Sequence, residues 1–104
     1  IILGMIINAE SSDRKEFSHT VEIMTAGAPP PAAILEGIEK LGFNVTHVYG
    51  LTETYGHAVM CFWQDQWDDT DFTQRAIIKA RQGVAMTATE STRVVDLNTR
   101  EDVP

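Results

Sequence analysis

Residues 21–50, "VEIMTAGAPPPAAILEGIEKLGFNVTHVYG", decide the fold, because two strand-like segments flank one helix-like segment. The first segment, "VEIM", alternates so that Val21 and Ile23 share one face, which is typical of a strand. The glycine and three prolines of "TAGAPPP" must end this strand. At the other end, "NVTHVYG" alternates again and predicts a second strand.

The segment between the strands, "AAILEGIEKLG" at residues 32–42, predicts an amphipathic helix. Its apolar side chains recur at helical spacing: Ile34, Leu35, Ile38 and Leu41. Glu36, Glu39 and Lys40 fall outside this stripe and are expected to face water. Pro31 suits the first helical turn, where a missing N–H is tolerated, and Gly42 supplies a left-handed C-terminal cap.

A strand, a helix of this length and a second strand predict a crossover unit whose two strands are parallel. In open parallel sheets, ligands bind beyond the carboxyl ends of the strands. Those ends are "TAGAP" at residues 25–29 and "YGLTE" at residues 49–53. We therefore expect an α/β fold, with a mainly parallel sheet and crossover helices, in which these two loops lie side by side.

Further elements are expected after residue 56. "AVMCFW" at residues 58–63 predicts a third, short strand, and "STRVVDLN" at residues 91–98 predicts the last strand. Between them a helix is expected to run to Ala80 or so and to end by Gly83. Its cap is one of three polar neighbours, Asp69, Thr70 or Asp71. Its modest apolar face consists of Phe72, Ala76, Ile77 and Ala80.

Composition narrows the class of protein. A length of 104 residues suits one small domain. Eight basic against fifteen acidic residues give a net charge of -7, which disfavours nucleic acid and anionic membranes as partners.

The lone Cys61 lies in the apolar run "AVMCFW" and is expected to be a buried thiol, not half of a disulfide. The apolar run at residues 1–7 is too short to span a bilayer and is expected to be the end of a buried helix. We expect no transmembrane segment and an intracellular, cytoplasmic location, with the organelle left open.

The stretch "HVYGLTETYG" at residues 47–56 carries the chemistry. The Tyr49 ring can stand against a flat heterocycle, and Gly50 lets the backbone pass close to a ligand. Thr52 offers a hydroxyl to a phosphate oxygen, and Glu53 offers an oxygen ligand to Mg²⁺. Two small residues of the neighbouring loop suit the opposite wall of a base pocket, namely Gly27 and Ala28. From the residues alone, a surface turn with a packed tyrosine remains the alternative to a nucleotide site.

At this separation, "TAGAPPP" followed by "YGLTET" resembles the adenylate-forming superfamily of acyl-CoA synthetases, luciferases and peptide-synthetase adenylation domains. Residues 21–56 look like its medium- and long-chain acyl-CoA synthetase branch, and "KARQGV" and "RVVDLNTREDVP" fit the same branch. The resemblance implies that residues 1–83 belong to the AMP-binding domain. It also implies that residues 84–104 begin a β-rich, barrel-like subdomain.

The resemblance implies a role for each loop residue on the nucleotide side. Tyr49 would stack on adenine, and three residues would line the opposite face: Gly27, Ala28 and Pro29. Gly50 and Leu51 would lie along the adenylate. Thr52 would bind the α-phosphate and act in catalysis together with Glu53, which would hold Mg²⁺. On the acyl side, the implied wall consists of His47, Gly50 and His57, and His57 stands where this branch is expected to have proline.

The implied activity is that of an ATP-dependent acid–thiol ligase. A fatty or other hydrophobic carboxylic acid would react with ATP to give acyl-AMP and pyrophosphate, and CoA would then accept the acyl group. ATP, Mg²⁺ and CoA are the implied cofactors and substrates. Two alternatives stay open, an acyl-AMP ligase that loads a carrier protein and a non-catalytic binding or regulatory module that retains half a nucleotide site.

Members of the resembled family are several-fold longer and carry a phosphate loop, a ribose-binding aspartate and a catalytic lysine outside the matching region. The sequence is therefore expected to be an internal fragment of the larger domain. Alone it should be inactive and a weak ATP binder. With neighbouring strands missing, four apolar side chains are expected to lie uncovered and to favour self-association: Val21, Ile23, Val45 and Val48.

Overall fold

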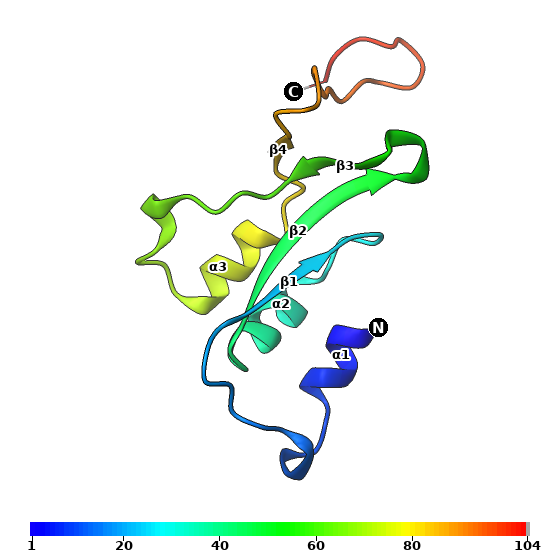
Figure 1. Ribbon diagram of the computed structural model, residues 1–104. Coiled ribbons are helices and arrows are strands. Elements are labelled where there is room, and N and C mark those ends of the chain that lie inside the picture. Colours follow the sequence, from blue (N-terminus) through cyan, green and yellow to red (C-terminus); the bar gives the residue numbers. More distant parts are fainter. Residues whose placement is uncertain (104) are drawn as a thin grey trace.

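The structure, a computed structural model, describes residues 1–103. These residues form an α/β arrangement with a four-stranded sheet in the order β1-β2-β3-β4 (Figure 1). The strands are β1 (Val21–Thr25), β2 (Phe43–Leu51), β3 (Gly56–Met60) and β4 (Val84–Ala85). The helices are α1 (Ile2–Ile7), α2 (Ala32–Glu39) and α3 (Phe72–Lys79). Helices α2 and α3 pack against each other and against β2, and α1 packs against α2.

The parallel β1–α2–β2 unit is confirmed. β1 pairs with β2 from Val21 opposite Phe43 to Thr25 opposite His47. Gly42 ends the helical segment with φ +91°, and its N–H donates to the Glu39 carbonyl at 3.0 Å. The core below β2 consists of Leu35, Ile38, Val45 and Ala76, each at most 1% exposed. The apolar stripe predicted for α2 therefore contributes to the core through Leu35 and Ile38.

The expectation of a mainly parallel sheet is wrong for residues 1–103, because the sheet is mixed. β3 runs antiparallel to β2, with Leu51 opposite Gly56, and β4 runs antiparallel to β3. The chain reverses through a 3₁₀ turn at Thr52–Thr54, and Tyr55 then adopts a left-handed conformation with φ 57°. This four-residue connection has none of the Asn-Gly character that marks a short hairpin in sequence. Residues 47–56 therefore form a hairpin and not a loop that follows a strand.

Glu39 corrects the predicted exposed face of α2. It is 7% exposed, and its carboxylate forms an ion pair with the buried ammonium group of Lys79 on α3. Arg75 Nε lies 3.7 Å from the other Glu39 oxygen. Glu39 is buried because α3 packs on the side of α2 that the sequence pattern predicts to face water. Helix α3 supplies Lys79 and Arg75, the cations that pair with Glu39.

Helix α3 begins at the expected place, since Asp71 Oδ1 accepts the Gln74 N–H at 2.8 Å. Its predicted apolar face is only partly used. Ala76 is buried, but Phe72 and Ile77 are 46% and 47% exposed. The side of α3 that faces α2 instead buries Lys79, whose charge is neutralised by Glu39.

The carboxyl-terminal residues (orange to red in Figure 1) project beyond β4. The strand expected at residues 91–98 is reduced to one isolated antiparallel bridge, Val95 with Asp102. The turn between these residues is closed by the Asp96 carboxylate, which accepts the backbone N–H groups of Asn98 and Thr99 at 2.8 Å. These hydrogen bonds lower the pKa of Asp96. The barrel-like subdomain and the domain boundary at residue 83 stay predictions.

The amino-terminal apolar run forms the expected helix, α1, but none of its residues is buried. Met5 is 67% exposed. Val45 and Val48, by contrast, are each 1% exposed, so the expectation that they lie uncovered is wrong. Helices α2 and α3 cover this part of β2 within the chain itself. No helix within residues 1–103 has both the length and the apolar character needed to cross a membrane.

Candidate nucleotide site

The tip of the β2–β3 hairpin presents the two residues expected to act on phosphate. Thr54 closes the turn, because its Oγ1 accepts the Leu51 N–H at 2.8 Å. The same hydroxyl lies 2.9 Å from the Leu51 carbonyl and 2.8 Å from the Gly56 carbonyl, and one of these accepts its proton. Thr52 and Glu53 are exposed at the tip. The turn thus holds their backbone while their side chains remain accessible to a ligand.

The structure gives a reason for glycine at position 50 that does not depend on a ligand. A Cβ at this position would lie 1.9 Å from the Gly56 carbonyl oxygen. The β2–β3 register shifts at Tyr49 and Gly50, so the two backbones approach closely here. The hairpin itself therefore requires glycine at position 50.

The loop after β1 leaves the sheet at the same end as the hairpin. Thr25 lies opposite His47, so residues 26–29 follow on beside the second half of β2 (Figure 1). Gly27 has φ +97°, and nothing lies within 4 Å of the position of its missing Cβ. Ala28 and Pro29 are exposed. Parallel pairing thus brings residues 25–29 and residues 49–53, here called the signature loops, to one end of the sheet.

Tyr49 is 41% exposed and lines a groove of about 530 Å³. Val59 of β3 lies on the same lining. The rest of the groove is made by two segments that sequence analysis did not assign to the site, Gln82–Gly83 and residues 92–95. The only signal in the sequence is Gly83, which predicts the end of a helix. Its φ is +96°, and a Cβ there would lie 2.1 Å from the Met60 carbonyl oxygen.

His47 is 2% exposed and lies between β2 and the end of α3. Its Nδ1 lies 2.8 Å from the Arg81 carbonyl oxygen. A carbonyl only accepts, so Nδ1 carries the proton and donates. His57, in contrast, is exposed on β3 opposite Gly50. Their assignment to an acyl wall stays a prediction.

Cys61 is buried, as expected, and follows β3 close to His47. Its backbone N–H donates to the His47 carbonyl at 2.9 Å. Burial raises the pKa of its thiol, and Sγ lies 3.4 Å from the Ile78 carbonyl. The raised pKa keeps the thiol protonated and so disfavours a nucleophilic role.

Glu53 is the carboxylate expected to hold Mg²⁺. Within residues 1–103, no three His, Cys, Asp or Glu side chains lie close enough together to form a metal site. Mg²⁺ commonly keeps several water ligands and takes one or two carboxylates together with substrate phosphates. An exposed Glu53 at the hairpin tip fits this single-carboxylate role in the presence of a nucleotide.

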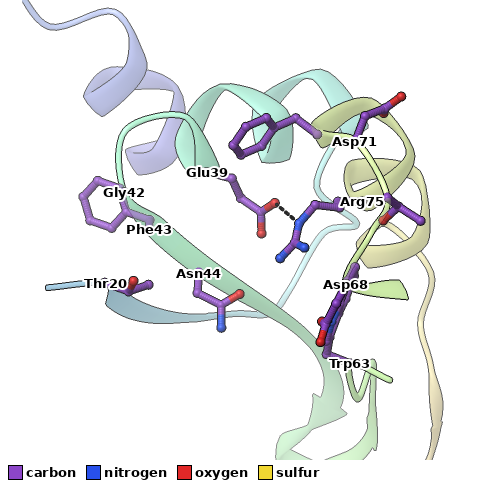
Figure 2. A pocket seen from close by; sticks show the side chains of 11 residues that line it. Thr20, Glu39, Gly42, Phe43, Asn44, Trp63, Asp68, Asp71 and Arg75 are labelled. Carbon is purple, nitrogen blue, oxygen red and sulfur yellow. Dashed lines mark hydrogen bonds and ion pairs between the residues drawn. The ribbon is translucent and has the colours of Figure 1, made fainter. Parts of the chain in front are cut away.

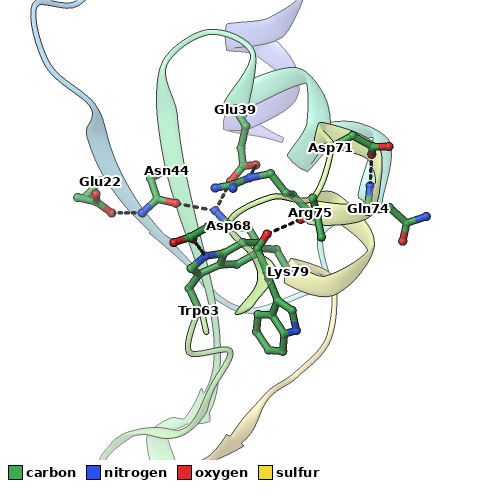
Figure 3. Close-up of polar contacts among 11 residues, drawn as sticks. Glu22, Glu39, Asn44, Trp63, Asp68, Asp71, Gln74, Arg75 and Lys79 are labelled. Atoms are coloured by element: carbon green, nitrogen blue, oxygen red, sulfur yellow. Dashed lines mark hydrogen bonds and ion pairs between the residues drawn. The ribbon is translucent and has the colours of Figure 1, made fainter. Parts of the chain in front are cut away.

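A second groove, of about 540 Å³, lies at the start of β2 and around α3 (Figure 2). Its polar network is structural (Figure 3). Lys79 Nζ donates to Asn44 Oδ1 at 2.5 Å, and Asn44 Nδ2 donates to Glu22 at 2.8 Å. The Arg75 guanidinium lies 4.4 Å from the Trp63 ring centroid. None of these residues belongs to the signature loops.

Comparison with known proteins identifies the class. The profile of the AMP-binding enzyme family matches residues 2–104, and the chain therefore belongs to this family. A peroxisomal acetate/butyrate–CoA ligase of Arabidopsis thaliana is 42% identical over 100% of the chain, which covers 18% of that protein.

Two further relatives show the same pattern. A 2-methylpropanoate–CoA ligase of Humulus lupulus is 48% identical over 92% of the chain and 17% of the relative. A peroxisomal trans-cinnamate:CoA ligase of Petunia hybrida is 37% identical over 99% of the chain and 18% of the relative. The chain thus spans less than a fifth of the length of these curated relatives.

Proposed function

We propose that this chain is part of an AMP-forming acid–thiol ligase that activates a carboxylic acid with ATP and transfers the acyl group to CoA. The hairpin tip carries the proposal, because it exposes Thr52 and Glu53 beside the partly exposed Tyr49. Membership of the AMP-binding enzyme family supports the use of ATP. CoA ligases among the relatives support CoA, rather than a carrier protein, as the acceptor.

The reaction has two balanced steps. The substrate carboxylate attacks the α-phosphorus of ATP, which forms acyl-AMP and releases pyrophosphate. The CoA thiolate then attacks the acyl carbon, which forms the thioester and releases AMP. In the first step the Thr52 hydroxyl would donate to an α-phosphate oxygen as negative charge builds on it. Glu53 would hold Mg²⁺, which when bound neutralises phosphate charge.

The nucleoside is proposed to lie against Tyr49. Its exposed ring supplies a flat apolar face for adenine. The loop with Gly27, Ala28 and Pro29 is proposed to lie on the opposite side of the base. The small residues Gly27, Ala28 and Gly50 leave room for the adenylate, which is also proposed to lie along Leu51.

The proposed acid is hydrophobic, and the fatty-acid class is the finer part of this proposal. The relatives named above act on acetate or butyrate, on 2-methylpropanoate and on trans-cinnamate. Their range supports a short-chain, branched or aromatic acid as well as a fatty acid. His47, Gly50 and His57 remain the proposed acyl-side residues. Two of the relatives named above are peroxisomal, which supports an intracellular location.

The roles of Thr52 and Glu53 are tested by ATP–pyrophosphate exchange in the full-length protein that carries these residues. Thr52→Ala and Glu53→Gln should each reduce the rate at least tenfold, equivalent to about 1.4 kcal/mol of barrier. Glu10→Gln is the matched control, because Glu10 is also exposed but precedes β1. Wild-type exchange rates in both variants would contradict the assigned roles.

A further inference from the structure

The turn that follows α3 is fixed against the sheet from two directions. His47 on β2 donates to the Arg81 carbonyl at 2.8 Å, one residue before Gln82. On the other side, Gly83 packs so closely on β3 that a Cβ would lie 2.1 Å from the Met60 carbonyl oxygen. The Gln82–Gly83 turn therefore has a defined position relative to both strands of the hairpin.

This turn lies beside Tyr49. Tyr49 and Val59 supply an aromatic and an aliphatic surface to the groove, and Gln82 and Gly83 line it with them. Its volume of about 530 Å³ falls within the range of small-molecule sites. Gln82 supplies the neutral carboxamide of the lining. A carboxamide carries both donors and an acceptor.

The proposed function places the flat base of ATP against Tyr49, and the inference rests on that proposal. Adenine presents an N6 amino donor next to the N7 acceptor, and a glutamine carboxamide pairs with both. A base with a carbonyl oxygen at position 6 has an acceptor where adenine has a donor, and it therefore loses this pairing. Gln82 at the edge of the Tyr49 groove is thus placed to distinguish adenine from such a base.

We propose that Gln82 is a specificity-determining residue that binds the adenine edge, and that His47 is a positioning residue that holds its turn. His47 does not touch the nucleotide in this assignment. It acts through the Arg81 carbonyl, because loss of the Nδ1–H bond frees the turn and misplaces the Gln82 carboxamide. The buried environment of His47, 2% exposed, keeps this bond away from competing water.

The test compares ATP with inosine triphosphate, which has a carbonyl at position 6, in the full-length protein. Pyrophosphate exchange gives kcat/KM for each nucleotide, and titration calorimetry gives each Kd independently of chemistry. Gln82→Ala should lower the preference for ATP about tenfold, mainly through KM and Kd for ATP. Gln74→Ala, an exposed glutamine on α3, is the matched control and should keep the preference.

The positioning role has its own variants. His47→Leu should lower the ATP preference as Gln82→Ala does, measured as the ratio of the Kd values for ATP and inosine triphosphate. His47→Asn, whose amide donor stands near the position of Nδ1, should restore most of it. Combining His47→Leu with Gln82→Ala should cause no further loss of preference. Val45→Ala, buried on the same strand at 1% exposure, controls for destabilisation and should leave KM for ATP unchanged.

Each result separates the inference from the proposed function. A wild-type protein without ATP–pyrophosphate exchange would contradict the ligase proposal, while the ratio of Kd values would still test Gln82. An unchanged ratio in Gln82→Ala would overturn the specificity role. A changed ratio in Gln82→Ala but not in His47→Leu would overturn the positioning role.

Discussion

Gly50 and Gly27 occupy the two signature loops, but their surroundings give the two glycines different roles. Gly50 faces the Gly56 carbonyl oxygen, 1.9 Å from where a Cβ would stand. Gly27 has φ +97° with open space around the missing Cβ. The first glycine is needed because of a close backbone approach, and the second because of its backbone conformation.

Alanine substitutions should separate these two reasons. Gly50→Ala should lower the free energy of unfolding by roughly 3 kcal/mol or more, because rigid backbone must move. Gly27→Ala should lower it by about 1 kcal/mol, the strain of a left-handed residue alone. Urea denaturation of the full-length protein, followed by circular dichroism, measures both. Equal losses in the two variants would show that the hairpin tolerates a side chain at position 50.

At the scale of elements, α2 and α3 are joined through a buried ion pair. The side chains of Glu39 and Lys79 are each 4% exposed, and Lys79 also binds Asn44 of β2. One Glu39 oxygen has no hydrogen bond among residues 1–103, although Arg75 Nε lies 3.7 Å away. Removing either partner would leave a buried charge that the remaining groups neutralise poorly.

Lys79→Met should therefore lower the free energy of unfolding by about 3–5 kcal/mol. The double variant Glu39→Met with Lys79→Met should lose clearly less, because no charge is left buried. Lys40→Met breaks the exposed pair with Glu36 at 2.6 Å and should change stability by at most about 0.5 kcal/mol. The measurement is a double-mutant cycle in urea. Additive losses would mean that the two buried charges do not interact.

At the scale of the whole molecule, the described residues expose more surface than a compact protein of their size. Their accessible area is 7970 Å², against roughly 5800 Å² for a compact monomer of this mass. The radius of gyration is 15.9 Å, against about 13 Å expected. Several large apolar side chains are more than half exposed: Ile1, Ile2, Met5, Leu51, Tyr55, Val84, Val94 and Leu97. These faces are suited to packing against further protein.

The isolated chain should accordingly self-associate and bind magnesium-ATP only weakly. Its hairpin tip is open to water, and water weakens the charge interactions on which phosphate binding depends. Sedimentation velocity over a range of concentrations tests self-association, and calorimetry tests binding. A monodisperse monomer would contradict the expected self-association. Micromolar affinity, about -8 kcal/mol, would show that the two loops suffice to bind the nucleotide.

Local signals in the sequence predict the β1–α2–β2 unit because each signal acts over a few residues. Alternation in the strands, the stripe with Leu35 and Ile38, and the cap at Gly42 need no distant partner. The sequence places Thr52 and Glu53 in a loop after the second strand, whereas the structure places both, exposed, in the turn of a hairpin. Parallel pairing then brings the two signature loops to one end of the sheet.

Contacts between distant residues were decided only by the tertiary structure. Glu39 is buried because Lys79, forty residues away, lies against it, and no period in α2 contains that information. The antiparallel return of β3 is more local, since it depends on the left-handed Tyr55 and on the close approach of Gly50 to Gly56, but no Asn-Gly pair marks it in the sequence. His47 reaches Arg81 across thirty-four residues, and the next residue, Gln82, lines the groove of Tyr49. Sequence pattern determined which local elements form, whereas packing between them determined the strand directions, the buried charges and the walls of the site.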